Sequence, residues 1–271
     1  MTSRKTIFIT GGASGIGRAV AQKFGAEGWF VGLADVDEAG MRETAAMLPA
    51  GASSTHKLDV RDRAAWGHEL AACAIAAGGR IDVVFNNAGV PLGGNLIDNN
   101  VAEIERCLDI NLKGVLFGAQ AAHPYLKASA PGSCLLNTAS AAGIYGTPGA
   151  SVYSATKFGV RAITESLDGE WFEDGIKVCD LMPAFIDTPL LDHAPNQGSN
   201  EHIRGRVVEG GLEITPVGTV AEAAWAAVHG TKLHNRVGKT ADRLAFASRW
   251  LPGRLRKQVR DSRQPLGGKS G

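Results

Sequence analysis

The sequence of 271 residues predicts one α/β domain in three layers, with helices on both faces of a doubly wound parallel sheet. Short apolar runs rich in β-branched residues alternate with longer amphipathic stretches, which is typical of parallel strands joined by helical crossovers. Glycine is frequent, with 35 residues, as expected where many strands turn tightly into helices. No internal repeat, and no linker rich in Pro or Ser, divides the chain.

The predicted elements follow one another along the chain in strict alternation. Strands are expected at 6–10, 29–34, 54–58, 81–86, 133–137 and 177–181. Helices are expected at 15–27, 37–48, 62–77, 101–127 and 153–174. Right-handed crossovers between parallel strands bring all the carboxyl ends of the strands to one edge of the sheet.

Beyond residue 185 the pattern loosens. Residues 188–215 hold Pro and Gly among polar residues, and we expect a mobile segment over the carboxyl edge, next to the substrate. A weak strand follows at 235–238. Residues 241–260 favour a basic, partly amphipathic helix. We therefore expect a main domain at 1–240 and a basic C-terminal extension at 241–271.

Composition excludes several functional classes. A net charge of +1 argues against a general nucleic-acid binder, although residues from 249 onward carry +6 and the rest −5. No signal-peptide core and no apolar stretch of ~18 residues is present, which predicts a cytoplasmic protein. The cysteines form no CxxC pair, and no Cys/His cluster has metal-ligand spacing, so we expect free thiols and no metal.

A glycine-rich turn, TGGASGIG at 10–17, lies between the first strand and the first helix. Backbone N–H groups and the helix N-terminus can face an anion there, and glycine lets the backbone approach a pyrophosphate. The residues expected at the dinucleotide are Gly11, Ser14, Gly15, Ile16 and Gly17. A purely structural turn is the alternative.

An acidic residue follows at the end of the second strand. Asp35 lies 18 residues beyond Gly17, where a carboxylate would reach the two ribose hydroxyls of an adenosine. A helix cap is the alternative, but Asp37 fits that role better. The pattern predicts a bound dinucleotide.

The glycine turn, Asn86-Asn87-Ala88-Gly89 and the run YSATK at 153–157 together resemble the short-chain dehydrogenase/reductase family over roughly 6–190. The resemblance implies a single Rossmann-type domain and an oxidoreductase that uses a nicotinamide dinucleotide. The sequence departs from the family where Ala184 replaces the Gly that usually follows Pro183. The path of that loop is therefore open.

The resemblance also assigns further cofactor contacts. Asn87, Ala88 and Gly89 would steady the sheet beside the cofactor. Asp59 and Val60 would lie along the adenine, with an ordinary strand-end Asp as the alternative. In the segment that begins at Pro183, itself expected at the cofactor, Ile186 and Thr188 match the positions that hold the nicotinamide carboxamide.

The reacting groups are expected on one helix and one strand end. Lys157 lies four residues after Tyr153, on the same helix face, so its ammonium, together with the positive charge of the oxidised nicotinamide, would lower the Tyr153 pKa and make it an acid/base. The Ser140 hydroxyl would hydrogen-bond the substrate oxygen, where charge develops. By resemblance, Asn111 bends its helix and carries a water that links Lys157 to solvent.

Other candidates are weaker. Ser151 competes with Ser140 but reads as an N-cap of the helix that carries the tyrosine. His193 and His123 lack an orienting carboxylate in the sequence and read as surface residues.

These features predict hydride transfer between NAD(H) and a secondary alcohol or ketone, in an apolar pocket. The pocket residues expected are Pro91, Leu92, Ile144, Tyr145, Ala184, Phe185, Leu190 and Leu191. NAD(H) is favoured over NADP(H) because Asp35 would repel a 2′-phosphate, and neither Arg18 nor Arg42 is well placed to offset that repulsion. The alternatives are an NADP-dependent carbonyl reductase, epimerisation, reduction of an acyl-carrier thioester, and an idle dinucleotide-sensing module.

Assembly is the last expectation. Helices 101–127 and 153–174 carry apolar residues on more than one side, which predicts a homodimer or homotetramer. For the basic extension, packing over the substrate entrance, packing on a partner subunit, contact with an anionic membrane and a solvated tail all stay open.

Overall fold

The computed structural model describes residues 4–199 and 202–261. Seven strands form one parallel sheet in the order β3-β2-β1-β4-β5-β6-β9. They are β1 (Thr6–Thr10), β2 (Phe30–Asp35), β3 (Ser53–Lys57), β4 (Val83–Asn86), β5 (Cys134–Thr138), β6 (Lys177–Pro183) and β9 (His234–Val237). The strand order reverses between β1 and β4, which is where doubly wound folds open a crevice for a ligand.

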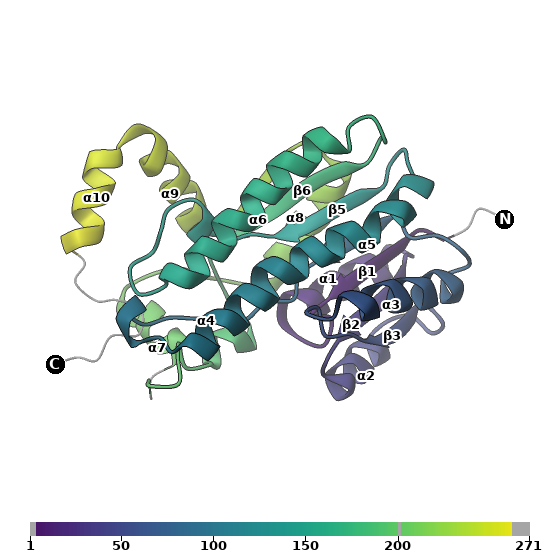
Figure 1. The fold of residues 1–271 in the computed structure, drawn as a ribbon, viewed down its shortest axis with the longest axis horizontal. Helices are drawn as coiled ribbons and strands as arrows, with labels where there is room; N and C mark the ends of the chain where they lie inside the picture. The colour runs from purple at the N-terminus through teal and green to yellow at the C-terminus, as the bar shows by residue number, and fades with distance from the viewer. Residues whose placement is uncertain (1–3, 200–201, 262–271) are drawn as a thin grey trace.

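Helices cover both faces of the sheet (Figure 1). One face carries α1 (Gly15–Ala26), α2 (Glu38–Ala46) and α8 (Val217–His229). The other carries α3 (Arg63–Ala76), α5 (Gly114–Ala128) and α6 (Ser151–Glu170). Neighbouring residues of β1 divide between the two layers, since Ile7 and Ile9 pack against the first set and Phe8 against the second. The predicted three-layer fold is confirmed.

Helix α8 is not among the elements predicted from the sequence. Its run from Val217 to Val228 is apolar on most sides, so it carries little amphipathic period. Packing against α1 and the sheet buries Val220, Ala224 and Ala227. Burial on the core, rather than sequence pattern, therefore defines this helix.

The long helix predicted at 101–127 is divided in two. A π-helical turn, η2 (Asp109–Lys113), separates α4 (Val101–Leu108) from α5. Such a turn inserts extra backbone into the helical ladder and re-aims the residues in it. Asn111 lies in this turn, which is where the resemblance places a bend.

The segment at 188–215 contains short elements. These are η4 (Pro189–Asp192), α7 (Ile203–Glu209) and β8 (Ile214–Thr215), of which β8 pairs with β7 (Phe185–Ile186) in a small parallel ladder. Two remaining 3-10 turns are η1 (Leu96–Asp98) and η3 (Ala141–Gly143). The mobility of 188–215 stays a prediction.

The C-terminal extension forms two helices where one was predicted at 241–260. Helix α9 (Lys239–Trp250) ends before Leu251, and α10 (Pro252–Asp261) begins at a proline. Proline lacks the N–H that would continue a helix but suits the first turn of a new one. The two helices form a bent arm that leaves the sheet after β9 (Figure 1). Residues 262–271 of the extension lie outside the described residues.

Candidate active site

A cavity of about 1340 Å³ lies at the carboxyl edge of the sheet. It exceeds the roughly 300–1,000 Å³ of a pocket for one small ligand, so it has room for a dinucleotide and a substrate. The predicted site residues that line it are Gly11, Ser14, Gly15, Ile16, Asp35, Asp59, Val60, Asn87, Ala88, Gly89, Ser140, Tyr153, Lys157, Pro183, Ile186 and Thr188. Of the predicted set, Gly17 and Asn111 do not line it.

The glycine turn is fixed by close packing of its backbone. Gly11 has a φ of +68°, a conformation that side chains with a Cβ disfavour. A Cβ on Gly17 would collide with the carbonyl oxygen of Gly11. Gly17 therefore lets the start of α1 pack against the turn, while the N-terminus of α1 opens on the cavity.

The end of β4 is tied to the same turn. The Asn87 side chain donates to the Thr10 carbonyl at 2.9 Å, and the Thr10 hydroxyl accepts from the N–H groups of Asn87 and Ala88 at 3.0 and 3.1 Å. These bonds join two strand ends far apart in sequence. They hold Ala88 and Gly89 against the crevice.

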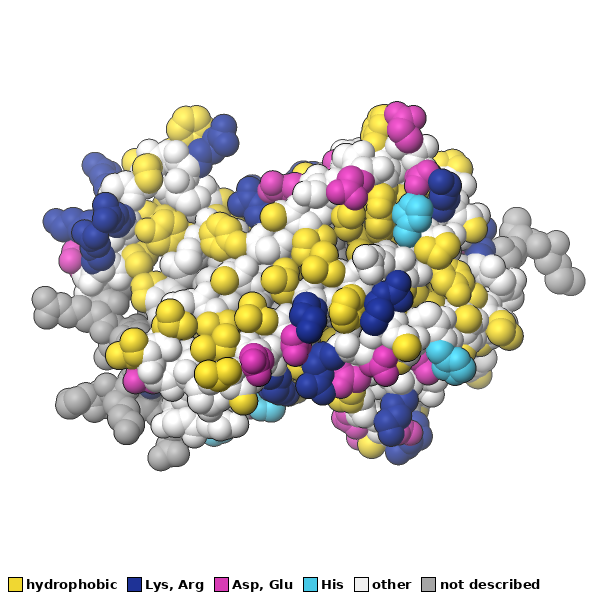
Figure 2. All heavy atoms as spheres, viewed as in Figure 1, with side chains coloured by type: hydrophobic (Ala, Val, Ile, Leu, Met, Phe, Trp, Pro, Cys, Tyr) yellow, Lys and Arg dark blue, Asp and Glu magenta, His cyan; other side chains and the backbone are white. Residues whose placement is uncertain are grey.

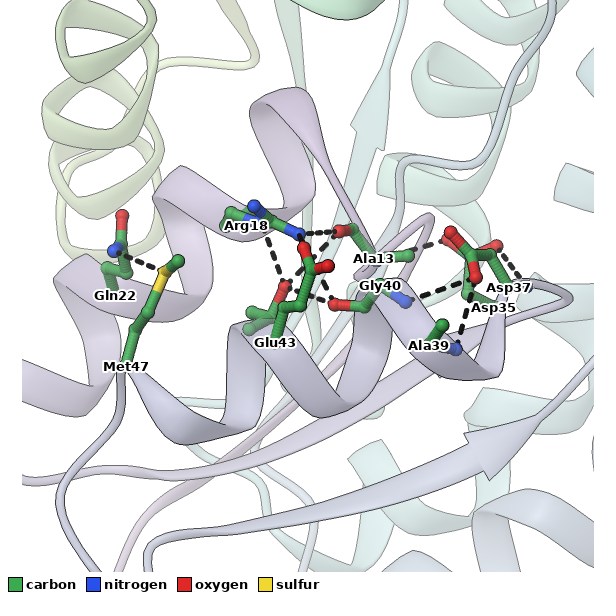
Figure 3. A network of polar contacts seen from close by, with 10 residues as sticks. Ala13, Arg18, Gln22, Asp35, Asp37, Ala39, Gly40, Glu43 and Met47 are labelled. Carbon is green, nitrogen blue, oxygen red and sulfur yellow. Dashed lines mark hydrogen bonds and ion pairs between the residues drawn. The ribbon is translucent and has the colours of Figure 1, made fainter.

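Asp35 faces the cavity from the end of β2, and Figure 3 shows its neighbours. Its carboxylate accepts from the N–H of Ala13 at 3.1 Å and from the N–H of Asp37 at 3.0 Å. Asp37 itself caps α2 by accepting from two backbone N–H groups, as predicted. Asp35 is thus held by the turn rather than used as a cap.

Arg18 is held on the other side of Ala13 from Asp35 (Figure 3). The Arg18 guanidinium donates to the Ala13 carbonyl at 2.6 Å and pairs with Glu43 at 2.9 Å. Neither Arg18 nor Arg42 lines the cavity. The expectation that neither offers a charge beside Asp35 agrees with this geometry.

Asp59 has a local partner that the sequence analysis does not include. Its carboxylate accepts from Arg61 in a bidentate pair, with Nη2 to Oδ2 at 2.6 Å. The hydrogen bond from Arg61 lowers the Asp59 pKa. Asp59 still lines the cavity, beside Val60.

Three reacting groups meet where β5 ends and α6 begins. Tyr153 lines the cavity with Ser140, whose hydroxyl donates to the Pro183 carbonyl at 3.4 Å and accepts from the Ala142 N–H at 3.1 Å. Lys157 is 4% exposed, and its ammonium donates to the Thr138 carbonyl at 2.8 Å. The Lys157 Nζ lies 5.5 Å from the centre of the Tyr153 ring. All three groups face one cavity.

Burial changes the pKa values of both groups in the protein alone. It raises the pKa of Tyr153 to about 12, against a smaller lowering by Ser140. It lowers the pKa of Lys157 to about 8. The lower Tyr153 pKa expected from Lys157 together with the oxidised nicotinamide stays a prediction.

Asn111 acts on a loop and not on the cavity. Its amide donates to the Val90 carbonyl at 2.9 Å and accepts from the Val90 N–H at 2.8 Å. This reciprocal pair anchors the chain that follows Gly89. The π-helical turn is what aims the Asn111 side chain at Val90. The predicted water contact stays a prediction.

The wall of the cavity is largely apolar, as predicted. The expected residues that line it are Pro91, Leu92, Tyr145, Ala184, Phe185, Leu190 and Leu191. Ile144 does not, because it packs in a small core cluster with Val115 and Val160.

Parts of the wall come from residues that the sequence analysis did not assign to the pocket. The arm contributes Thr240, Leu244, Gln258 and Val259, and α7 contributes Arg206 and Glu209. The amphipathic pattern of 241–260 was the one signal for the arm. Packing over the entrance was one of several alternatives that it left open.

Two weaker candidates need correction. His123 does have a carboxylate partner, since its Nε2 lies 2.7 Å from Asp174, but neither residue lines the cavity. Ser151 is the first residue of α6 and not its cap, because the helix starts earlier than predicted and Ala150 is the N-cap. His193 does not line the cavity either.

Comparison with known proteins agrees with this geometry. The short chain dehydrogenase family matches residues 5–198. The chain belongs to that family. It is an NAD(P)-dependent oxidoreductase of the short-chain dehydrogenase type, acting on an alcohol or ketone.

Three similar proteins illustrate the range. Meso-2,3-butanediol dehydrogenase of Serratia marcescens is 33% identical over 71% of this chain and 76% of its own length. The 3-alpha-(or 20-beta)-hydroxysteroid dehydrogenase of Mycobacterium bovis is 36% identical over 70% of this chain and 72% of its own. A short-chain dehydrogenase/reductase from Burkholderia phymatum, solved with NAD, superimposes with a TM-score of 0.82 at 26% identity. That comparison covers 95% of this chain and 97% of the other.

Metal-ligating clusters and membrane-spanning helices are both absent from the described residues. Within 4–199 and 202–261, no group of His, Cys, Asp or Glu side chains is arranged to hold a metal ion. In the same residues, no helix is long and apolar enough to cross a membrane.

Proposed function

We propose that the protein transfers a hydride between NAD(H) and a secondary alcohol or ketone of hydrophobic character. The observation that carries this proposal is that Tyr153, Ser140 and the buried Lys157 line the same cavity as the glycine turn. The apolar wall supports a hydrophobic substrate. The four cysteines are free and buried, which supports a reducing compartment such as the cytoplasm.

The cradle fits a dinucleotide. The N-terminus of α1 and the glycine turn suit the pyrophosphate, and Asp35 suits the ribose hydroxyls. Val60 and Asp59 would border the adenine. Gly89, Pro183, Ile186 and Thr188 would surround the nicotinamide end.

NAD(H) is preferred over NADP(H) in this proposal. A 2′-phosphate would bring ~1.5–2 negative charges against the Asp35 carboxylate. Arg18 cannot offset them, since its guanidinium is held by Ala13 and Glu43 behind the turn. Solved relatives bound to NAD support the choice.

The protein groups divide the acid/base work. When bound, the nicotinamide supplies or accepts the hydride, and in its oxidised form it brings a positive charge. Tyr153 takes the alcohol proton during oxidation and returns it during reduction. Its pKa of about 12 in the protein alone would be lowered by that positive charge and by a protonated Lys157. Ser140 holds the reacting oxygen where charge develops.

Asn111 is a positioning residue in this mechanism. By pairing with both backbone groups of Val90 it fixes the loop that starts at Gly89, beside Lys157. The Asn111 Oδ1 lies close enough to limit any side chain at Gly89. Loss of these two hydrogen bonds would allow this part of the cavity wall to move.

Thioester reduction is less well supported. Within the segment at 188–215, Arg204 is not free to meet an acyl-carrier partner, because it is paired with Asp187 and Asp192 at 2.7 and 2.6 Å. Arg206 shares the wall with Glu209. A simple alcohol or ketone needs neither.

A homodimer through α4, α5 and α6 is also proposed. Of the apolar residues on these helices, Val115 and Trp171 are buried, and the half-buried ones are Ile104, Leu108, Leu112 and Ile163. Leu116 and Phe158 stay exposed, at 42% and 41%, on helices that lie side by side in Figure 1. Light scattering on Leu116→Ser/Phe158→Ser should give a smaller mass than the wild type; equal masses would argue against this interface.

The function is tested by following NADH absorbance with a panel of hydrophobic ketones and secondary alcohols. We expect turnover with at least one, and a larger kcat/KM with NADH than with NADPH. Cofactor binding without turnover across the panel would favour the idle sensing module. Equal or better use of NADPH would favour the NADP-dependent reductase.

A further inference from the structure

The arm formed by α9 and α10 has two different sides. Leu244 and Val259 line the cavity, and Leu255 is buried. At 100° per residue, Phe246 and Trp250 lie on the side of α9 opposite Leu244. These two side chains are 60% and 64% exposed. Leu251, at the bend between the helices, is exposed as well.

Basic residues flank these hydrophobic side chains. Residues 239–261 contain seven Lys or Arg and two Asp, a charge of +5, so the rest of the chain carries −4. All seven cations are exposed; apart from Lys239 at the start of α9, the six flanking cations are Arg243, Arg249, Arg254, Arg256, Lys257 and Arg260. The Arg249 guanidinium lies 5.3 Å from the centre of the Trp250 ring. Figure 2 shows Lys and Arg side chains along the outside of the arm.

The acidic residues of the arm do not neutralise these cations. Asp242 pairs with Arg236 of β9 at 2.7 Å, outside the arm. Within the described residues, 4–199 and 202–261, no ion pair involves the six flanking cations. The positive charge on the outer side of the arm is therefore uncompensated by the fold.

We propose that the outer side of this arm docks on an anionic lipid surface. Exposed Trp, Phe and Leu flanked by Lys and Arg are typical of interfacial helices, where the rings enter the headgroup layer and the cations meet lipid phosphates. Each Lys or Arg near such a surface contributes to binding, and the contribution falls with salt. A headgroup layer is negative over its whole area, which matches cations spread along both helices. A protein partner would need a matching row of carboxylates.

Docking would also place the cavity beside the lipid. The same two helices carry lipid-facing residues on one side and the cavity-lining Leu244 and Val259 on the other. A hydrophobic alcohol or ketone dissolved in the bilayer would then enter over a short distance. This consequence rests on the proposed function, whereas lipid binding itself does not.

The test is sedimentation of the full chain with phosphatidylcholine vesicles, with and without about one third phosphatidylglycerol. We expect binding to be at least about tenfold stronger to the anionic vesicles and to disappear in high salt. Arg254→Glu/Arg256→Glu/Lys257→Glu should abolish it. Phe246→Ser/Trp250→Ser should weaken it about tenfold or more, because the rings no longer insert.

The matched control is Ile75→Ser/Phe172→Ser, which removes two exposed hydrophobic side chains away from the arm. It should bind vesicles like the wild type. Circular dichroism and the thermal midpoint check that each variant folds. Equal binding to both vesicle types, or wild-type binding by both arm variants, overturns the proposal. A drop in mass by light scattering in the arm variants, with no vesicle binding by the wild type, would assign the arm to a second copy. The vesicle assay contains no cofactor or substrate, so a failure to bind lipid does not bear on the proposed function.

Discussion

The two sides of the cavity are held in different ways. On the cofactor side, buried or half-buried hydrogen bonds join the glycine turn to the ends of β2 and β4, through Asp35 and Asn87. On the substrate side, the chain after β6 is held by exposed ion pairs such as those of Arg204, and by an arm with few buried residues. Exposed ion pairs contribute little and weaken in salt.

This difference matches two tasks. A dinucleotide has one fixed shape of phosphate and ribose, so a preorganised cradle binds it with little loss of entropy. Substrates vary among members of one family, and loops beyond the scaffold can vary without disturbing the sheet. Changes on the cofactor side should thus alter binding or cofactor choice, and changes on the substrate side should alter selectivity.

The largest expected effect is at the boundary between the two sides. Tyr153→Phe removes the proton donor and acceptor but keeps the ring, so kcat should fall about 10²–10⁴-fold. NADH affinity, measured by fluorescence titration, should change little. Retention of more than about a tenth of the wild-type kcat would show that another group moves the proton.

A second effect concerns only the cofactor side. Asp35→Ser with Val36→Arg replaces repulsion by attraction toward a 2′-phosphate, and should shift the ratio of kcat/KM for NADH and NADPH by ~100-fold or more. The control is Asp37→Ala, which loses the cap of α2 and should cost about 1 kcal/mol of stability without changing that ratio. An unchanged ratio of kcat/KM values in the double variant would show that Asp35 does not bind the ribose hydroxyls.

A third effect appears in the pH dependence of stability. Burial lowers the Lys157 pKa to about 8, below its unfolded value of ~10.4, so between these pH values the unfolded chain binds more protons. The contribution of Lys157 to the free energy of unfolding therefore rises with pH across that window, by up to a few kcal/mol. Tyr153 and the buried Cys107 have raised pKa values and act in the opposite sense at higher pH.

Lys157→Met isolates this contribution. Urea unfolding is measured for both proteins from pH 7 to pH 10. The free energy of unfolding of the wild type should rise with pH relative to that of the variant, because the wild type loses its buried charge. A difference independent of pH would mean that Lys157 keeps an ordinary pKa.

The smallest effect is expected on the arm. Leu244→Ala and Val259→Ala shorten cavity-lining side chains, so KM for bulky substrates should rise about threefold to tenfold, while KM for NADH and for small ketones stays unchanged. Phe246→Ala, on the outer side, is the control. If all three variants have equal KM values for bulky substrates, the inner side of the arm does not contribute to substrate selection.

Local patterns in the sequence were enough for the alternation of strands and helices, the glycine turn, and the four-residue step from Tyr153 to Lys157. Each depends on residues close in the chain, where backbone geometry and side-chain period decide the outcome. Motif order extended this to many of the residues that line the cavity. Boundaries were less certain, and Ser151 changed role because α6 begins two residues earlier than predicted.

Tertiary structure decided what depends on contacts between distant segments. It paired Asn111 with Val90, tied Arg18 to Glu43, and folded the arm back so that Val259 reaches the cavity. It also buried Tyr153 and Lys157, which raises the pKa of Tyr153 to about 12 and lowers that of Lys157 to about 8 in the protein alone. Burial is a property of the whole packed chain, so the four-residue spacing of the two side chains does not reveal how strongly each is desolvated.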